Sequence, residues 1–549
     1  MTFHKKIFRF ILIALSVVAF NALIDLGPLQ PSNYVAALNN DLAKTPPMGW
    51  NSWNIFAGNI DETKIKQIAD AMVSSGMRDA GYIYLNLDDN WMANPARDSS
   101  GNLRGDPTRF PSGMKALGDY IHSKGLKFGI YGCRGTMTCM GIPQSGSYGN
   151  EQRDANTFAS WGVDYLKYDN CNAVGNMQTD YQNMQRALAN CGRPIIFSIC
   201  AWQYQSWMPA TGNLWRVSPD ITDKWDNGTN YFKGIINAID ANAGYASSAS
   251  PGAWNDPDML EIGNGGCTTE EYRTQMSMWS MMAAPLIAGN DIRTMSQTTK
   301  DILLNSEIIA VDQDPGGIQG TRVSAGSGLE VWCKPLGSAN GTTKAVALLN
   351  RNGTAANITV NFANIGLSGT VTVRDLWAKA DRGGFSGSYT VSVPSHGAGM
   401  LKLTGAVSPT PTPTPVGSYV RFSNVATGLY IDGMSSTANG SNACQWGNSN
   451  STNQQWTLIN SGGYVMIQNR ATGLYLDGMG RTSNGSVCGQ WGYSGSTNQQ
   501  WIQETTGSYV RFKNGATGLY LDGMGSTGNG SNLCQWSNSG SANQQWQIQ

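Results

Sequence analysis

Short apolar runs alternate with amphipathic segments between residues 45 and 316. The runs "YIYLNLDD", "LKFGIYGC", "VDYLKYDN" and "PIIFSIC" are rich enough in apolar side chains to predict buried strands. Segments with helical spacing separate them, as in "DETKIKQIADAMVSSGMRDAG", where Asp61 caps the start and Gly81 marks the end. About eight strands, with no GxGxxG motif after the first, predict an α/β fold, a parallel (β/α)8 TIM barrel over residues 38–316.

Residues 317–405 change to short alternating strands such as "LEVWCKPL", "KAVALLNR" and "GTVTVRDLW". This alternation places apolar side chains on one face of each strand, so we predict an antiparallel β-sandwich domain packed against the barrel. None of the candidate chemistry described below lies in this stretch, and we therefore expect its role to be structural.

A proline-rich stretch, "SPTPTPTPVG", separates the last part of the chain from the rest. Repeated proline keeps a chain extended and out of a core, so residues 406–417 are a predicted linker. Beyond it, "ATGLYIDGM" and two copies of "ATGLYLDGM" begin 45 residues apart, at Ala426, Ala471 and Ala516, and each unit ends in "NQQW". Three such copies with Gly- and Asn-rich turns predict an all-β module over residues 418–549 with threefold pseudosymmetry.

The repeats resemble the ricin-B-type β-trefoil lectins and carbohydrate-binding modules, because each has a Q-x-W triplet, a preceding Asp and an intermediate Trp. The resemblance implies a shallow sugar site in each repeat, where the Asp accepts from hydroxyls, the intermediate Trp stacks on the ring and an Asn assists. The final Trp of each repeat is expected in the core. The matching positions are Asp432, Trp446 and Asn453; Asp477, Trp491 and Asn498; and Asp522, Trp536 and Asn543.

Composition narrows the partners of the protein. The net charge is zero and only 13% of residues are charged, so no basic surface is expected to attract nucleic acid. Aromatic residues make up 10% of the chain, with 18 Trp among many short polar residues. This mixture suits carbohydrate, because a pyranose presents an apolar C–H face and a rim of hydroxyls.

The N-terminus is typical of a secretory signal. Lys5, Lys6 and Arg9 precede an apolar run over residues 10–24. This run is shorter than the ~20 residues of a membrane-spanning helix. We therefore expect residues 1–37 to be removed and the mature protein to be secreted, extracellular and without a membrane anchor.

The cysteines and histidines do not indicate a metal site. The chain has ten cysteines at irregular spacing, three histidines, and no CxxC or HExxH motif, so neither a metal nor another cofactor is expected. Disulfides are permitted in an exported chain. The sequence assigns no partner to Cys133, Cys191, Cys200, Cys267 and Cys333, and each trefoil repeat has a single cysteine, at Cys444, Cys488 or Cys534.

Several predicted strands end in charged or aromatic residues, and in a barrel these ends meet at one face. The residues at these ends are Trp50, Trp53, Asp88, Asp89, Tyr131, Lys167, Asp169, Arg216, Asp220, Asp256 and Asp258. A single Asp after a strand is often only a helix cap, and Asp256, before Pro257, has an equally good explanation as a loop-shaping residue. Charged ends on successive strands nevertheless indicate one site.

Two carboxylates between aromatic walls indicate glycoside hydrolysis. One carboxylate must attack the anomeric carbon in its ionised form. Lys167, two residues before Asp169 on the same strand face, favours that form of Asp169 and is placed to donate to a sugar hydroxyl. Asp220 is the candidate proton donor, and this role requires a raised pKa.

Residues 42–405 resemble the retaining α-galactosidases of glycoside hydrolase family twenty-seven. The family's markers occur in order as "PPMGWNSW", "LDDNW", "GIY", "WGVDYLKYDNC", "WRVSPDI", "GAWNDPDML" and "MAAPLIAGND". The resemblance implies a barrel followed by a β domain, and hydrolysis of terminal α-D-galactosyl residues with retention by double displacement. The expected partners are thus α-galactosides in the barrel and polysaccharide on the trefoil.

By motif, the resemblance makes Asp169 the nucleophile and Asp220 the acid/base. It also implies a disulfide between Cys139 and Cys171 that braces the nucleophile strand. The substrate-binding residues that it implies are Trp53, Asp88, Asp89, Tyr131, Lys167, Arg216 and Asp258.

Ala201 departs from the family pattern, since many α-galactosidases have Glu there, beside the sugar's 2-position. Relatives that accept N-acetylgalactosamine use small residues, but their second small residue is matched here by Tyr204. The family also includes β-L-arabinopyranosidases, whose sugar lacks the hydroxymethyl group. Asp88 and Asp89 favour galactose over that sugar, because a site built to bond a hydroxyl rejects an analogue that lacks it. A secreted lectin with an inactive barrel is the remaining alternative, and the two catalytic carboxylates argue against it.

Overall fold

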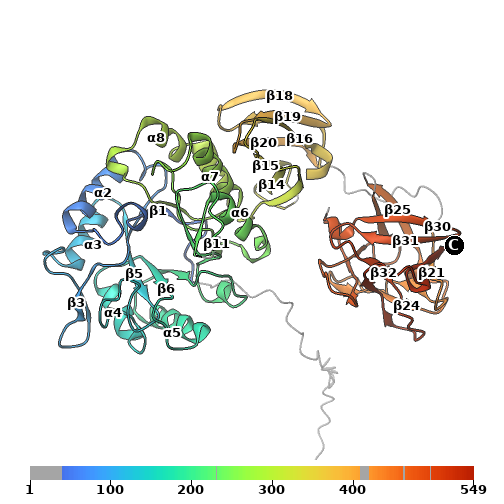
Figure 1. Ribbon diagram of the computed structural model, residues 1–549, viewed down its shortest axis with the longest axis horizontal. Coiled ribbons are helices and arrows are strands. Elements are labelled where there is room, and N and C mark those ends of the chain that lie inside the picture. The colour runs from blue at the N-terminus through green and yellow to red at the C-terminus, as the bar shows by residue number, and fades with distance from the viewer. Residues whose placement is uncertain (1–39, 230, 340, 408–418, 462–463, 495) are drawn as a thin grey trace, which may run out of the picture.

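A computed structural model of the protein describes residues 40–407 and 419–549, apart from residues 230, 340, 462–463 and 495. Figure 1 shows a barrel of strands and helices (blue to green), a β-sandwich beside it (yellow) and an all-β C-terminal part (orange to red). The predicted signal and nearly all of the predicted linker lie outside the described residues. Within the described ranges, no helix has the length and apolar character needed to cross a membrane.

The first part is a closed sheet of parallel strands, as predicted. These strands are β1 (Met48–Asn51), β2 (Tyr84–Leu87), β5 (Lys127–Cys133), β6 (Tyr165–Asp169), β7 (Ile196–Cys200), β8 (Leu214–Arg216), β11 (Trp254–Asp256) and β12 (Leu286–Ala288). They lie side by side in chain order, and β12 pairs with β1. A parallel bridge from Leu260 to Ala288 joins β12 to the chain that follows β11 and completes the barrel.

Helices surround this barrel (Figure 1). The helices of this part of the chain are α1 (Trp53–Phe56), α2 (Glu62–Ser74), α3 (Met114–Ser123), α4 (Glu151–Ser160), α5 (Met177–Asn190), α6 (Ile235–Ala243), α7 (Thr269–Met281), α8 (Gln297–Leu303) and α9 (Ser306–Asp312). The side chain of Asp61 caps α2, as predicted, by accepting from the Lys64 amide at 2.7 Å. The helix ends at Ser74, before the expected Gly81, because Gly76 adopts a left-handed conformation with φ of 86°.

Residues in the connections between barrel strands and helices form two small pairs of strands. One joins β3 (Met92–Arg97) to β4 (Leu103–Gly105), and the other joins β9 (Asp220–Ile221) to β10 (Phe232–Lys233). The second pair is parallel, and its register places Phe232 beside Asp220. An aromatic residue therefore lies next to the proposed proton donor.

The second part is the predicted antiparallel sandwich. One sheet has the order β13-β14-β15-β20-β17-β18, and β16 pairs with β19 in the other. The strands are β13 (Thr321–Gly326), β14 (Leu329–Pro335), β15 (Thr343–Asn350), β16 (Ala356–Asn361), β17 (Leu367–Asp375), β18 (Ala380–Ser386), β19 (Ser388–Val393) and β20 (Ala398–Val407). β20 runs past the expected boundary at 405, because Val407 still pairs with Leu367.

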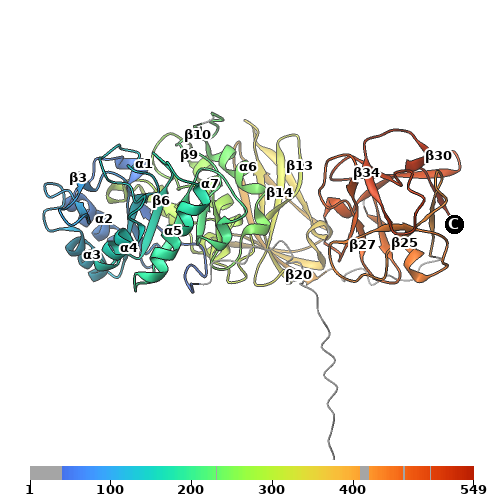
Figure 2. The same cartoon turned by 90° about the horizontal axis from the view of Figure 1, so that it is seen from below.

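The sandwich packs on helix α7 of the barrel, and Figure 2 shows the two parts side by side. Polar contacts also cross this interface. The Lys334 ammonium donates to the Ser280 carbonyl at 3.1 Å, and the Trp377 indole donates to the Ser277 hydroxyl at 2.9 Å. These contacts fix the sandwich on the C-terminal half of α7.

The third part is the predicted β-trefoil. Its strands are β21 (Phe422–Asn424), β22 (Tyr430–Asp432), β23 (Ser441–Asn442), β24 (Cys444–Trp446), β25 (Trp456–Ser461), β26 (Tyr464–Asn469), β27 (Tyr475–Asp477), β28 (Ser486–Val487), β29 (Gly489–Trp491), β30 (Trp501–Thr506), β31 (Tyr509–Asn514), β32 (Tyr520–Asp522), β33 (Ser531–Asn532), β34 (Cys534–Trp536) and β35 (Trp546–Ile548). β21 pairs with β35 and so joins the first repeat to the last. The final tryptophans, Trp456, Trp501 and Trp546, are fully buried in one core, as expected.

Candidate active site

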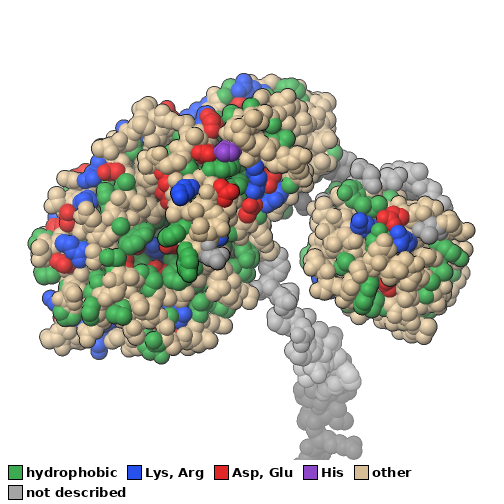
Figure 3. Space-filling model, viewed as in Figure 1, with side chains coloured by type: hydrophobic (Ala, Val, Ile, Leu, Met, Phe, Trp, Pro, Cys, Tyr) green, Lys and Arg blue, Asp and Glu red, His purple; other side chains and the backbone are tan. Residues whose placement is uncertain are grey.

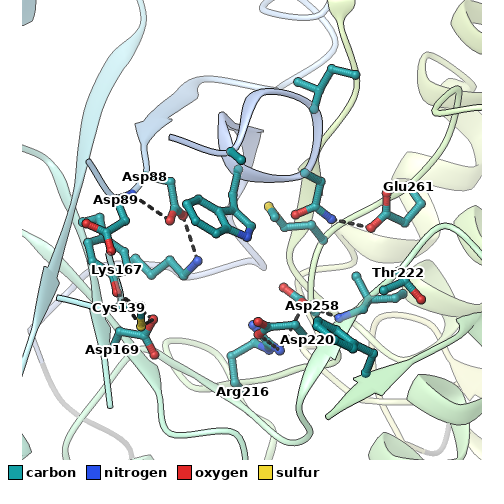
Figure 4. Close-up of a pocket in the computed structure, with 18 of the residues that line it drawn as sticks. Asp88, Asp89, Cys139, Lys167, Asp169, Arg216, Asp220, Thr222, Asp258 and Glu261 are labelled. Carbon is teal, nitrogen blue, oxygen red and sulfur yellow. Dashed lines mark hydrogen bonds and ion pairs between the residues drawn. The ribbon is translucent and has the colours of Figure 1, made fainter. Parts of the chain in front are cut away.

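A cavity of about 670 Å³ opens at the carboxyl ends of the barrel strands. In Figure 3, charged side chains lie at the bottom of a hollow in the barrel and hydrophobic side chains lie at its rim. Figure 4 shows the cavity close up. All the proposed catalytic, substrate-binding and disulfide residues line it: Trp53, Asp88, Asp89, Tyr131, Cys139, Lys167, Asp169, Cys171, Arg216, Asp220 and Asp258.

Asp88 and Lys167 form an ion pair on one side of the cavity (Figure 4). The Lys167 ammonium donates to Asp88 Oδ2 at 2.8 Å, and the side-chain amide of Asn51 donates to the same oxygen at 2.8 Å. The carboxylates around Lys167, with Asp88 foremost, outweigh burial and raise its pKa well above the usual value. Lys167 is therefore a fixed positive charge held chiefly by Asp88.

Asp89 is oriented by the loop that follows β5. The Met140 amide donates to Asp89 Oδ2 at 2.9 Å, and the Asn90 amide donates to Oδ1 at 2.6 Å. Burial raises the pKa of Asp89 to about 6. Two main-chain donors fix this carboxylate at the cavity wall, where it is available to a ligand hydroxyl.

Asp169 ends strand β6 and is held by two donors. The Tyr131 hydroxyl donates to its Oδ2 at 2.8 Å and the Asn170 amide to its Oδ1 at 2.8 Å. The predicted disulfide joins Cys139 to Cys171, and Cys139 Sγ lies 3.2 Å from Asp169 Oδ2. The disulfide thus braces the loop after β5 against the end of β6.

The pKa of Asp169 differs from the expectation that Lys167 alone would hold it ionised. Burial raises the pKa of Asp169, and Lys167, the Asn170 amide and the Tyr131 hydroxyl oppose that rise only in part. Burial is thus the larger effect, and the Lys167 ammonium makes its hydrogen bond to Asp88 rather than to Asp169.

Arg216 ends strand β8 and contacts two carboxylates. Its Nη2 lies 3.0 Å from Asp220 Oδ1 and 3.0 Å from Asp258 Oδ2. Burial alone would raise the pKa of Asp220, but Arg216 and Lys167 lower it below the usual value. The raised pKa expected of a proton donor is therefore absent in the free protein, because Arg216 stabilises the ionised form of Asp220.

Asp258 links the segment that carries Asp220 to the loop after β11. Its Oδ2 accepts from the Ile221 amide at 2.8 Å, and its own amide donates to Asp256 Oδ1 at 2.8 Å. Asp256 does not line the main cavity and instead shapes the loop that carries Asp258. Trp50, named among the strand ends, is fully buried and donates to the Asn290 carbonyl at 2.7 Å, so it belongs to the core.

The outer part of the cavity contains residues that the sequence did not single out. Ile55 and Phe232 lie at the mouth with 36% and 48% of their surfaces exposed. Trp202 lies two residues after β7, so its position near a strand end was the signal that could have found it. The other added lining residues lie in or beside α1, β9 and the loops after β9 and β11: Asn54, Ala57, Ile221, Thr222, Asp223, Met259, Glu261 and Asn264.

Tyr204 does not line the cavity, contrary to the expectation that it would restrict the sugar's 2-position. Its ring packs on Tyr245 with the centroids 4.4 Å apart, and its hydroxyl lies 2.9 Å from the Ser248 hydroxyl. The loop after β7 thus packs this side chain against the barrel core, away from the cavity. Ala201 is buried directly before the cavity-lining Trp202.

The proposed trefoil positions occupy equivalent places in the three repeats. In each repeat the Asp pairs with a residue of the neighbouring strand that lies two positions before the intermediate Trp. Side chains two positions apart on a strand point to the same face, so the Asp and the Trp share one face of the sheet. Each Asp is buried and caps the next turn, as Asp432 does by accepting from the Met434 amide at 2.8 Å. The intermediate tryptophans are half-buried, and Trp446 packs on Gly530 of the third repeat.

The cysteines outside the disulfide are free thiols in the described structure. They are Cys133, Cys191, Cys200, Cys267, Cys333, Cys444, Cys488 and Cys534. Cys200 lies 3.8 Å from Arg216 Nη1 beneath the site, and burial raises its pKa well above the usual value. This thiol is therefore an uncharged packing group.

Comparisons with known proteins agree with this geometry. Residues 45–314 match the α-galactosidase A family, residues 326–403 the α-galactosidase C-terminal β-sandwich domain, and residues 407–491 and 497–549 the ricin-type β-trefoil lectin domain. The chain is 48% identical over 371 residues to an α-galactosidase of Cyamopsis tetragonoloba (66% of this chain, 87% of the relative). It is 47% identical over 398 residues to α-galactosidase 2 of Arabidopsis thaliana (71% and 98%).

A solved structure gives the same result. The crystal structure of α-galactosidase I from Mortierella vinacea superimposes with a TM-score of 0.63 at 40% identity, covering 67% of this chain and all of that one. The chain therefore belongs to the α-galactosidases of glycoside hydrolase family 27 and carries a ricin-type trefoil in addition.

Proposed function

We propose that the protein is a secreted, retaining exo-α-galactosidase that removes terminal α-D-galactosyl residues from oligo- and polysaccharides. The observation that carries this proposal is the placement of Asp169 and Asp220 on opposite sides of one strand-end cavity (Figure 4). Retaining glycosidases need two carboxyl groups that face each other across the scissile bond.

In the first step, an Asp169 oxygen attacks the anomeric carbon while the bond to the leaving oxygen breaks. Asp220 gives its proton to that oxygen, so the aglycone departs as a neutral alcohol. The Tyr131 hydroxyl, 2.8 Å from Asp169 Oδ2, orients the attacking carboxylate. In the second step, Asp220 takes a proton from a water molecule as the water oxygen attacks the anomeric carbon. The bond between this carbon and Asp169 breaks, which releases galactose and restores the Asp169 carboxylate.

The proton is distributed unevenly between the two carboxyl groups of the free enzyme. Burial raises the pKa of Asp169, whereas Arg216 and Lys167 lower that of Asp220. The pKa of Asp169 therefore lies above that of Asp220, and the reactive arrangement, with Asp169 ionised and Asp220 protonated, is less populated than the reverse one. Substrate must favour the reactive arrangement, because the glycosidic oxygen offers Asp220 an acceptor for its proton.

The cluster of Asp88, Asp89 and Lys167 supports galactose as the sugar. It offers two carboxylates and one ammonium within a buried wall, which suits several hydroxyls including that of the hydroxymethyl group. An arabinopyranoside lacks this group and would leave a buried acceptor unpaired. We expect kcat/KM for p-nitrophenyl α-D-galactoside to exceed that for the β-L-arabinopyranoside by ~10²-fold or more.

An α-N-acetylgalactosaminide is a second candidate substrate. Tyr204 packs on Tyr245 and so does not bar a 2-acetamido group. Comparing kcat/KM for the p-nitrophenyl glycosides of galactose, N-acetylgalactosamine and arabinopyranose tests the assignment. A preference for the arabinopyranoside would contradict the main proposal.

The trefoil and the N-terminus complete the proposal. We infer that residues 1–37 direct export and that the trefoil holds the enzyme on polysaccharide through its repeated Asp and Trp positions. Several weak sites on one chain raise avidity for a polymer, because each additional contact forms at high local concentration. N-terminal sequencing of the protein from a culture medium tests the first inference.

A further inference from the structure

The segment that carries Asp220 is anchored from outside the cavity. Three residues after Asp220, the Asp223 carboxylate accepts from the Tyr272 hydroxyl at 2.9 and 2.8 Å and also from the Gly266 amide. A Cβ at position 266 would lie 2.2 Å from the Asp223 carbonyl oxygen, so only glycine allows this approach. The start of helix α7 therefore holds one side of the segment.

The β-sandwich contacts the other side of the same segment. The imidazole of His396, in the turn between β19 and β20, stacks on the indole of Trp225 with the centroids 4.6 Å apart and the planes 9° apart. Trp225 lies five positions after Asp220 on the β9 loop. A residue of the second domain thus packs directly on the loop of the proposed proton donor.

The imidazole is itself fixed in place. His396 Nδ1 donates to Glu271 Oε1 at 2.7 Å, and Glu271 Oε2 accepts from the Thr268 amide at 2.7 Å. Burial alone would raise the pKa of Glu271, but the hydrogen bonds from Thr268 and His396 lower it, so the acceptor is a carboxylate. The Thr274 hydroxyl donates to the His396 carbonyl at 2.7 Å.

The backbone of His396 is in the left-handed region, with φ of 54°. Glycine would adopt this conformation at less cost, so the imidazole side chain is what the position contributes. The sandwich is already docked by Lys334 and Trp377 on helix α7. The stack on Trp225 is therefore not needed to hold the two domains together.

We propose that His396 is a positioning residue for the acid/base, and that the sandwich acts in catalysis by holding the Asp220 loop through Trp225. This inference rests on the proposed role of Asp220. A loosened loop would misplace the proton donor while leaving Asp169 and the galactose-binding wall intact. The loss should therefore depend on how much the leaving group needs a proton.

The test compares two substrates with small leaving groups, one that needs protonation to depart and one that does not. Methyl α-galactoside requires protonation of its leaving oxygen, whereas α-galactosyl fluoride departs with little help. The variants are His396→Asn and Trp225→Leu. The matched control is His122→Asn, because His122 also pairs with a carboxylate, Asp164 at 2.7 Å, but lies on helix α3. Rates are expressed per active site, titrated with a covalent galactose-configured inhibitor.

We expect kcat/KM for the methyl galactoside to fall ~10-fold or more in both variants, and by no more than the ~10²–10⁴-fold that a general acid supplies in total. For the fluoride we expect a change of less than ~2-fold, and the control should match the wild type on both substrates. Equal losses on both substrates, or no loss on either, would overturn the inference.

Asp220→Ala separates this inference from the function on which it rests. For this variant, kcat/KM should fall far more for the methyl galactoside than for the fluoride. If Asp220→Ala lost both equally, the acid/base assignment itself would be wrong. If Asp220→Ala behaved as expected and the two loop variants did not, only the positioning role would fail.

Discussion

At the scale of single residues, the two proposed catalytic carboxylates differ in what surrounds them. Asp169 is buried between the Tyr131 hydroxyl and the Asn170 amide, whereas Asp220 contacts the Arg216 guanidinium at 3.0 Å with 46% of its side chain exposed. Burial favours the neutral form and a nearby cation favours the ionised form. Burial therefore raises the pKa of Asp169 and Arg216 lowers that of Asp220, so Asp220 loses its proton first and Asp169 after it.

This ordering predicts the effect of Tyr131→Phe on the pH profile. Loss of the hydrogen bond removes a donor that favours ionised Asp169, so the pKa of Asp169 rises further. Because Asp169 has the higher pKa of the pair, the alkaline limb of kcat/KM should move to higher pH, by less than ~1 unit, and the maximum should fall. Tyr148→Phe, at an exposed tyrosine outside the cavity, is the control. Movement of the acidic limb instead would show that Asp169 has the lower pKa.

At the scale of elements, the strand ends were predictable and the loop orientations were not. Continuous apolar strands in a parallel barrel bring residues such as Asp89, Asp169 and Arg216 to one face, whatever the loops do. Tyr204 packs on Tyr245 instead of lining the cavity, and no local pattern encodes this contact. The contact between Trp225 and His396 joins two domains and is equally invisible in the sequence.

The trefoil repeats separate core from surface within one motif. Trp456 is fully buried and donates to the Ile431 carbonyl at 3.0 Å, whereas Trp446 of the same repeat is half-buried. We expect Trp456→Ala to destabilise the trefoil by about 3–5 kcal/mol. Trp446→Ala should change its thermal transition much less and should weaken retention in affinity electrophoresis through polysaccharide. Calorimetry of the full chain measures the first effect, and equal destabilisation by both variants would refute the distinction.

At the scale of the whole molecule, the chain combines a catalytic barrel and its sandwich with a trefoil that has its own core. The proline-rich stretch between them was predicted to be a linker. The sandwich was expected to be only structural, and its contact with the Asp220 loop argues for a closer relation to catalysis. The trefoil, in contrast, has a core separate from that of the barrel, which argues that it affects binding to polysaccharide rather than catalysis.

Truncation after Val407 tests that division. We expect kcat/KM for p-nitrophenyl α-galactoside to stay within ~2-fold of the full chain, whereas activity on an insoluble galactoside polymer should fall ~10-fold or more. The full chain with Trp446, Trp491 and Trp536 all changed to Ala is the matched control, because it keeps the trefoil but removes the proposed stacking rings. Unchanged activity of both proteins on the polymer would leave the trefoil without a role in substrate capture.

The central claim is that Asp169 attacks the sugar from the face opposite the leaving group and that Asp220 supplies the proton. The most direct measurement is the configuration of the product that Asp169→Ala forms from α-galactosyl fluoride in the presence of azide. Azide would occupy the space of the lost carboxylate and displace fluoride with a single inversion. We predict β-galactosyl azide, identified by NMR. An α-galactosyl azide, or undiminished hydrolysis without azide, would contradict the assignment of Asp169.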